Sequence, residues 1–225
     1  GWGWDELKFA HFITPYQGAR FCELLDNAHN LPLHLAVELG VPVALLLCGG
    51  ALVAVLRATP WRDTHPARQM AWAGLATIAL HSLLEYPLWY GPFQLATLLC
   101  LWLLWRTRTG APAAPRRMAQ LPLSLLAATG LLASAAYVGW DYWRVGQLFV
   151  PQAHRAPAYR DDTLAKVSDS WLFRDMVRFA RVTTTVPSPD NAAALYADAL
   201  QTLHYSPEPR VIGAVLESAR LLGQE

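Results

Sequence analysis

Long apolar segments alternate with short polar ones along the first two thirds of the chain. The apolar segments cover residues 32–56, 69–86, 88–105 and 121–140. Each approaches the length of about 20 mostly apolar residues that a helix needs to cross a bilayer. We therefore predict an all-α, polytopic membrane helix bundle with four spanning helices over residues 32–140. Little more than Pro87 separates the second segment from the third, which predicts a tight hairpin.

The pattern changes after residue 140, where polar and apolar positions mix as they do in soluble helices. Residues 162–184 carry apolar side chains at helical spacing. Residues 188–190 (SPD) and 206–208 (SPE) each place a cap residue and a proline before a further helical stretch. We expect residues 141–225 to form a soluble helical tail. A relationship to helical-hairpin repeats of the tetratricopeptide type is left open.

Composition supports residence in a membrane. Hydrophobic residues make up 54% of the 225 residues and charged residues only 16%, with ten tryptophans. An average soluble domain has about 25% charged and about 45–50% apolar residues. The net charge of +1 gives no overall electrostatic reason to expect a nucleic-acid partner.

Arginine is concentrated in two polar loops, residues 57–68 and 106–119. The arginines are Arg57, Arg62, Arg68, Arg106, Arg108, Arg116 and Arg117. By the positive-inside rule both loops face the cytoplasm, which leaves the N-terminal segment, the hairpin tip and the tail on the opposite face. In a Gram-negative bacterium that face is the periplasm. The prediction is a multi-pass inner-membrane protein whose tail is periplasmic.

The opening residues GWGW include no initiator Met and none of the charged start of a signal peptide. A polytopic protein that starts within a loop is expected to be a fragment, with further helices upstream.

Other kinds of chemistry have little support in the sequence. Cys22, Cys48 and Cys100 are an odd number without paired spacing, which argues against a disulfide framework or a zinc site. The Asp161-Asp162 pair is expected to cap the helix that follows it rather than to bind a metal. No glycine-rich phosphate-binding motif is present. We expect no metal and no cofactor.

The polar stretch DNAHN, residues 26–30, directly precedes the first apolar segment. Its Asp and Asn residues are good helix caps, so the stretch can be purely structural. Alternatively, His29 is a reacting group at the membrane surface. The segment it introduces also carries His34 and Glu38 four residues apart, and ionisable groups in spanning segments are functional candidates by default. Because these two lie near the segment end, they could instead simply reach water.

Three stretches resemble motifs of one superfamily. His29-Asn30, followed after nine residues by Gly40, is similar to the His-[Asn/Ser/Gln]-x9-Gly signature of bacterial O-antigen ligases. Residues 1–7 (GWGWDEL) resemble the Gly-aromatic-Gly start of the large periplasmic loop of that superfamily. Residues 1–31 are then expected to form the end of that loop, directly before the first apolar segment. Residues 81–90 (HSLLEYPLWY) resemble a stretch of its protein O-oligosaccharyltransferase and virulence-factor membrane-bound polymerase branch. The resemblance covers about residues 1–105, and the tail fits the C-terminal extension of that branch more loosely.

The resemblance implies transfer of a glycan from undecaprenyl diphosphate to an acceptor hydroxyl on the periplasmic side. His29 is then expected to be the general base, because histidine, with an unperturbed pKa of about 6.5, accepts protons near neutral pH. A single displacement predicts inversion at the anomeric carbon. Free N–H groups at the start of the following helix are expected to stabilise the diphosphate leaving group.

Further substrate-binding residues are expected around His29. The candidates are Asn30, Arg20, Lys8, His81 and Glu85, with Gly40, Tyr86 and Pro87 as the motif framework. Lys8 and Arg20 lie on the side of the membrane that suits diphosphate binding, as does the more weakly supported His11, but each is equally well an ordinary loop residue. His81 and Glu85 could orient each other, contact the acceptor or form a structural pair. The aromatic residues of this stretch could stack on sugar rings or belong to an interfacial aromatic belt.

Three functions stay open from the sequence. The first is an O-antigen ligase-like enzyme or protein O-oligosaccharyltransferase, and the second is a Wzy-type polysaccharide polymerase. The third is a non-catalytic membrane anchor whose helical tail binds a partner protein, or a part of a transporter. The expected partners are membrane lipid, a lipid-linked oligosaccharide and an acceptor glycolipid or protein.

Overall fold

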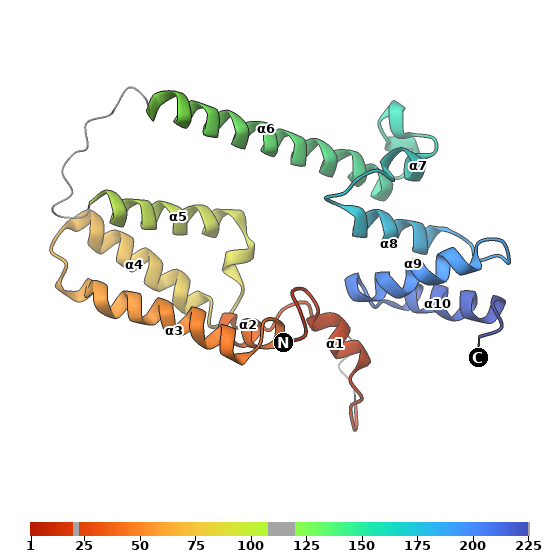
Figure 1. Ribbon diagram of the computed structural model, residues 1–225, viewed down its shortest axis with the longest axis horizontal. Coiled ribbons are helices and arrows are strands. Elements are labelled where there is room, and N and C mark those ends of the chain that lie inside the picture. Colours follow the sequence, from red (N-terminus) through yellow and green to blue (C-terminus); the bar gives the residue numbers. More distant parts are fainter. Residues whose placement is uncertain (20–22, 108–119, 225) are drawn as a thin grey trace. The chain divides into compact units, whose positions relative to one another are not determined.

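Helices make up all the regular structure of the computed structural model, which describes residues 1–19, 23–107 and 120–224 (Figure 1). No strand occurs within these ranges, which confirms the all-α prediction. The chain divides into two compact units, Gly1–Ala114 and Pro115–Glu225, and each is described by itself.

In the part of the N-terminal unit that the structure describes, there are five α-helices and two 3₁₀ turns. They are α1 (Leu7–Ile13), α2 (Leu31–Glu38), α3 (Val41–Ala58), η1 (Pro60–Arg62), α4 (Pro66–His81), η2 (Pro87–Trp89) and α5 (Gly91–Arg106). Within this unit α2 packs against α3, and α4 packs against α5. The expected hairpin of the second and third apolar segments is therefore present as α4 and α5 (Figure 1).

The first expected spanning helix, residues 32–56, is not continuous. Gly40 has a φ of 93°, a backbone conformation that side-chain-bearing residues rarely adopt, and it ends α2 and starts α3. The polar positions of the segment therefore belong to the separate short helix α2. Helix α3 together with the 3₁₀ turn η1, Val41–Arg62, is the one helical stretch of the described residues that is both long and apolar enough to cross a bilayer.

By this criterion the described residues contain one span instead of the four predicted, and for α4 and α5 the helix lengths give the reason. Helices α4 and α5 have 16 residues each. At 1.5 Å per residue this is about 24 Å, less than the roughly 30 Å hydrocarbon core of a bilayer. Helix α4 ends at His81 and α5 starts at Gly91, because residues 82–90 form an irregular turn that includes Pro87.

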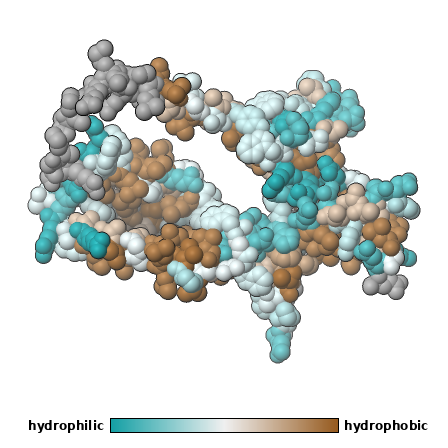
Figure 2. All heavy atoms as spheres, viewed as in Figure 1, coloured by the Kyte–Doolittle hydropathy of each residue, from teal (hydrophilic) through white to brown (hydrophobic). Residues whose placement is uncertain are grey.

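Large apolar side chains cover the outside of the N-terminal unit. Leu46 on α3 is 72% exposed and Leu98 on α5 is 63% exposed. Figure 2 shows the hydrophobic surface gathered over α3 and over the α4–α5 hairpin. A continuous apolar surface of this kind is typical of a region that contacts a membrane or a protein partner instead of water.

The α4–α5 contact depends on a small residue. A Cβ atom added at Gly74 would lie 3.0 Å from the Sγ atom of Cys100 on α5. Small residues let membrane helices approach closely, and van der Waals packing is then the main attraction between them.

We predict that Gly74→Leu destabilises the hairpin by about 1–3 kcal/mol, because the larger side chain overpacks the contact with α5. Gly49→Leu is the matched control, since a Cβ atom at Gly49 on α3 meets no other atom within 4 Å. Thermal unfolding of the detergent-solubilised protein measures both variants. Equal loss of stability in the two variants would contradict the packing described here.

The C-terminal unit starts with a long helix and ends in a three-helix bundle. Its helices are α6 (Gln120–Gly146), α7 (Thr163–Val167), α8 (Arg174–Thr184), α9 (Ala192–Tyr205) and α10 (Pro209–Leu221), with 3₁₀ turns at Gln147–Phe149, Gln152–His154 and Pro157–Tyr159. Helices α8, α9 and α10 pack pairwise around small buried residues. The expected helix at 162–184 is divided into α7 and α8. Asp162 takes the N-cap position of α7 with a φ of 49°, but its side chain makes no capping hydrogen bond.

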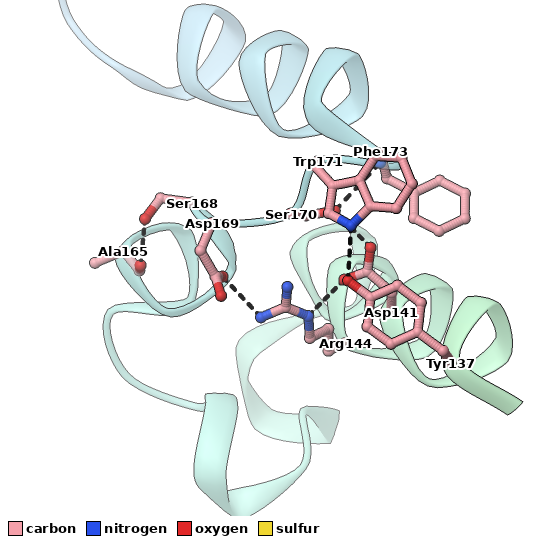
Figure 3. A network of polar contacts seen from close by, with 9 residues as sticks. All are labelled: Tyr137, Asp141, Arg144, Ala165, Ser168, Asp169, Ser170, Trp171 and Phe173. Atoms are coloured by element: carbon pink, nitrogen blue, oxygen red, sulfur yellow. Dashed lines mark hydrogen bonds and ion pairs between the residues drawn. The ribbon is translucent and has the colours of Figure 1, made fainter. Parts of the chain in front are cut away.

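A buried polar network ties α6 to the turn before α8 (Figure 3). Arg144 donates from Nε to Asp141 Oδ1 over 2.6 Å and from Nη1 to Asp169 Oδ1 over 2.8 Å. Ser170 donates through its hydroxyl to the second oxygen of Asp141 at 2.8 Å. Asp141 is 0% and Arg144 5% exposed. The hydrogen bond from Arg144 lowers the pKa of Asp169 against the opposing effect of burial.

We predict that Asp141→Ala costs about 3–5 kcal/mol of stability, because it leaves the guanidinium of Arg144 buried beside one exposed carboxylate only. Asp175→Ala is the control, since it removes an ion pair to Arg178 in which the aspartate side chain is 46% exposed. Such exposed pairs contribute about 0–1 kcal/mol. Chemical unfolding followed by near-UV circular dichroism measures both variants, and similar losses would show that the network is not stabilising.

Candidate functional site

Two stretches singled out in the sequence meet at one end of the N-terminal unit. His29 precedes α2, and Glu85 lies in the irregular turn between α4 and α5. The Nδ1 atom of His29 lies 2.8 Å from Oε2 of Glu85. The ring of Tyr86 meets the imidazole edge-on, with 4.9 Å between the ring centroids. The fold therefore brings together residues 56 positions apart in the sequence.

The backbone at His29 is held in an uncommon conformation. Its φ is 49°, in the left-handed region that residues with a side chain rarely occupy. The side chain of Asn27, only 6% exposed, accepts a hydrogen bond from the His29 N–H at 2.9 Å. Strained residues persist where the surrounding structure fixes them, and they are concentrated at functional sites.

Asn30 joins the two stretches. Its Oδ1 atom accepts from the Leu33 N–H at 3.0 Å and so caps α2, while its Nδ2 atom donates to the carbonyl of Leu83 at 2.9 Å. Next to it, the Leu31 N–H donates to the carbonyl of Ser82 at 2.7 Å. Asn30 therefore caps α2, as the structural interpretation of the polar stretch predicts, and its contact with Leu83 places His29 beside Glu85. The functional interpretation of His29 stays a prediction.

One expectation about the start of α2 is wrong. Its N–H groups were expected to be free for a diphosphate, but the Leu31 and Leu33 groups are used as described above. The His34 N–H donates to the Asn30 carbonyl, and Pro32 has no N–H. The helix start therefore offers no donor for an anion among its first four residues.

The geometry suits His29 to proton transfer. A carboxylate only accepts hydrogen bonds, so its partner Nδ1 carries the proton and the lone pair of the neutral ring lies on Nε2. The side chains of His29 and Glu85 are 54% and 50% exposed, which leaves the pair accessible from outside. This is the arrangement in which a carboxylate orients a histidine for proton transfer.

Tyr86 adds a neutral donor beside the pair. Its ring stacks on Tyr90 with 5.6 Å between centroids. The hydrogen bond and charge interaction with Tyr90 raise the pKa of Tyr86, and burial, Asp26 and Glu85 act in the same direction. The phenol therefore stays protonated at neutral pH and can donate a hydrogen bond.

His34 and Glu38 form a second pair, which is buried, on α2. They are 3% and 1% exposed, with 3.7 Å between Nε2 and Oε2. The same Glu38 oxygen accepts from the Asp5 N–H at 2.7 Å, and the Glu38 carbonyl accepts from the Gly3 N–H at 2.9 Å. Gly40 allows the chain start to approach, since a Cβ atom there would lie 3.0 Å from the Gly1 nitrogen. These residues thus hold the N-terminal segment against α2 rather than reach water.

The other candidates make contacts of their own. Lys8 lies 2.9 Å from the Asp5 carboxylate, and His11 lies 3.1 Å from the Tyr16 hydroxyl. His81 packs edge-on against Phe93, so the carboxylate of Glu85 orients His29 and not His81. Pro87 is buried in η2.

Arg20 lies outside the described residues. Among those that are described, no group of three or more His, Cys, Asp or Glu side chains could hold a metal ion.

Sequence reasoning did not pair His29 with Glu85. Both motifs were identified and placed on the same side of the membrane, so their proximity could have been proposed. The direct contact between His29 and Glu85 could not have been proposed, because His81, four residues before Glu85, was the nearer candidate partner of Glu85 along the chain.

We predict that Asn30→Ala lowers the stability of the protein by about 0.5–2 kcal/mol, as the loss of an N-cap does. Asn30→Asp keeps the capping oxygen and loses only the donation to Leu83, so its loss should be smaller. Thermal unfolding of both variants gives the comparison. A larger loss for Asn30→Asp would show that the Leu83 contact, and not the cap, is the stabilising part.

A family model described as virulence factor membrane-bound polymerase, C-terminal, matches residues 69–225, more than half of the chain. The matched region includes Glu85, Tyr86 and the helical tail, and it begins after His29. No curated protein and no solved structure shows a significant match.

Proposed function

Since the chain belongs to the virulence factor membrane-bound polymerase family, we propose that it is a membrane glycosyltransferase that moves a glycan from undecaprenyl diphosphate to an acceptor hydroxyl. The observation that carries this proposal is the 2.8 Å contact between His29 and Glu85, in the same unit as the apolar helix α3. The membership itself supports a membrane polymerase or ligase. The transfer reaction and its residues are the proposal.

In the proposed step the acceptor hydroxyl gives its proton to Nε2 of His29 while its oxygen forms a bond to the anomeric carbon. The bond between that carbon and the diphosphate oxygen breaks, and the lipid diphosphate leaves with the electron pair. Glu85 stabilises the imidazolium that forms on His29. A single displacement of this kind inverts the anomeric configuration.

The charge that grows on the diphosphate needs a cation, because the N–H groups at the start of α2 are already occupied. Lys8 and Arg20 are the proposed sources within this chain. The exposed Asp5 carboxylate lies 2.9 Å from Lys8, so Lys8 would have to exchange one anion for another.

We place the protein in a bacterial inner membrane with the His29–Glu85 pair and the tail on the periplasmic side. Helix α3 meets the requirements for a span, and we propose that α4, α5 and α6 also lie in the membrane. Their exposed leucines support this, with Leu95 at 59% and Leu131 at 72% exposure. Helices shorter than the bilayer core can be accommodated by local thinning of the bilayer.

Polymer extension is the second candidate within the same chemistry, and the description of the matched family favours it. In that reaction the acceptor hydroxyl belongs to another lipid-linked glycan. In a ligase or a protein transferase it belongs to a glycolipid or to a Ser or Thr side chain. All three use the same base and the same donor.

We predict that His29→Ala lowers the rate of glycan transfer about 10²–10⁴-fold, the usual contribution of a general base. Glu85→Gln should cause a smaller loss, because the amide can still accept from Nδ1 but carries no charge. His154→Ala, a change at an exposed tail residue, is the control. The assay measures transfer from purified donor lipid in proteoliposomes. A normally expressed His29→Ala protein with the wild-type rate would remove the basis of the proposal.

A further inference from the structure

Trp4 and Trp89 form an exposed aromatic pair that the transfer step does not use. Their rings are stacked, with 6.1 Å between centroids and 9° between planes, although the residues are far apart in the sequence. Trp4 is 60% and Trp89 41% exposed even in this arrangement. Each indole therefore keeps apolar surface open to the outside although the two rings stack on each other.

A buried histidine, His34, packs against both tryptophan rings. The ring of His34 meets Trp4 edge-on at 6.4 Å and Trp89 edge-on at 5.1 Å between centroids. Glu38 in turn holds His34, and it accepts the hydrogen bond from the N–H of Asp5, the residue after Trp4. The two tryptophans are thus positioned by a buried ionisable pair that is costly to bury.

The backbone around Trp4 is also constrained. Gly3 has a φ of 118° and Asp5 a φ of 66°, so both neighbours of Trp4 are in the positive-φ region. A tryptophan that only anchors a protein at a membrane interface needs no defined ring partner and no strained backbone. Strain that the surrounding structure maintains favours a binding role.

The aromatic pair adjoins the proposed reaction site. Trp89 lies at the end of η2, between Tyr86, which contacts His29, and Tyr90, which stacks on Tyr86. The turn that carries Glu85 therefore also carries one half of the tryptophan pair.

We propose that Trp4 and Trp89 form a subsite that binds a pyranose ring of the glycan, which rests on the transferase function proposed above. The C–H groups on the face of a pyranose carry partial positive charge and are attracted to the negative face of an indole. Binding sites for such ligands combine apolar surface with a few polar groups. The Asp5 carboxylate follows Trp4 in the chain and accepts from Lys8 through both oxygens, and with 57% of its side chain exposed it can accept further hydrogen bonds from sugar hydroxyls.

The direct test is binding of the soluble oligosaccharide released by mild acid from the donor lipid, measured by calorimetry on the detergent-solubilised protein. Trp4→Ala and Trp89→Ala should each weaken binding about tenfold, since each removes one ring face. Trp89→Phe keeps a ring and should bind nearly as the wild type does, which separates stacking from misfolding. Trp2→Ala is the matched control, because Trp2 is 56% exposed in the same segment and its N–H contact to Val37 is made by the backbone.

His29→Ala separates this subsite from the transfer function, because it should lower the rate of transfer about 10²–10⁴-fold while wild-type-like affinity for the oligosaccharide is retained. In the transfer assay, Trp4→Ala should raise the KM for the donor lipid if the donor ring occupies the subsite, or the KM for the acceptor if the acceptor ring does. The proposal is overturned if the wild type does not bind the oligosaccharide, or if Trp4→Ala and Trp89→Ala bind as the wild type does. It is also overturned if Trp2→Ala weakens binding equally, since that result indicates a general membrane-anchoring role of these tryptophans.

Discussion

The arrangement of the N-terminal unit depends on how the end of α4 meets the start of α2. Every helix leaves unpaired N–H groups at its start and unpaired carbonyls at its end, and near a membrane water satisfies them poorly. Here Leu31 and the side chain of Asn30 donate to the carbonyls of Ser82 and Leu83. The start of α2 thus provides the hydrogen-bond donors for two carbonyls directly after the end of α4. His29 and Glu85 lie directly beside these contacts, so the same hydrogen bonds that complete the backbone also assemble the pair.

In both units, buried ionisable groups join segments that are distant in the sequence. Glu38 ties the N-terminal segment to α2, and Asp141 with Arg144 ties α6 to the turn before α8. Burying such groups is costly unless each is paired, so their benefit lies in fixing one arrangement of the segments that they join. In the N-terminal unit this fixed arrangement places Trp4 against Trp89, and in the C-terminal unit it joins α6 to the turn that leads into the bundle of α8, α9 and α10.

The sequence predicted the helical class and the approximate helices, because apolar runs report burial or lipid contact whatever their exact geometry. It did not predict the break at Gly40, since a glycine within an apolar run is equally compatible with a continuous helix. The shortness of α4 was missed because the run continues through residues 82–86 although the helix does not. Within the site, the capping role of Asn30 was readable from its residue type. The partner of His29 depends on a tertiary contact that spacing along the chain does not encode.

We propose that His29 and Glu85 act as one unit in glycan transfer. A double-mutant cycle on kcat/KM tests this coupling by comparing His29→Ala, Glu85→Gln and the double variant in the same proteoliposome assay. Residues that act as a unit give strongly non-additive losses. We expect the double variant to transfer glycan no more slowly than His29→Ala alone. Losses that multiply would show that the two residues act independently and would rule out the coupled pair.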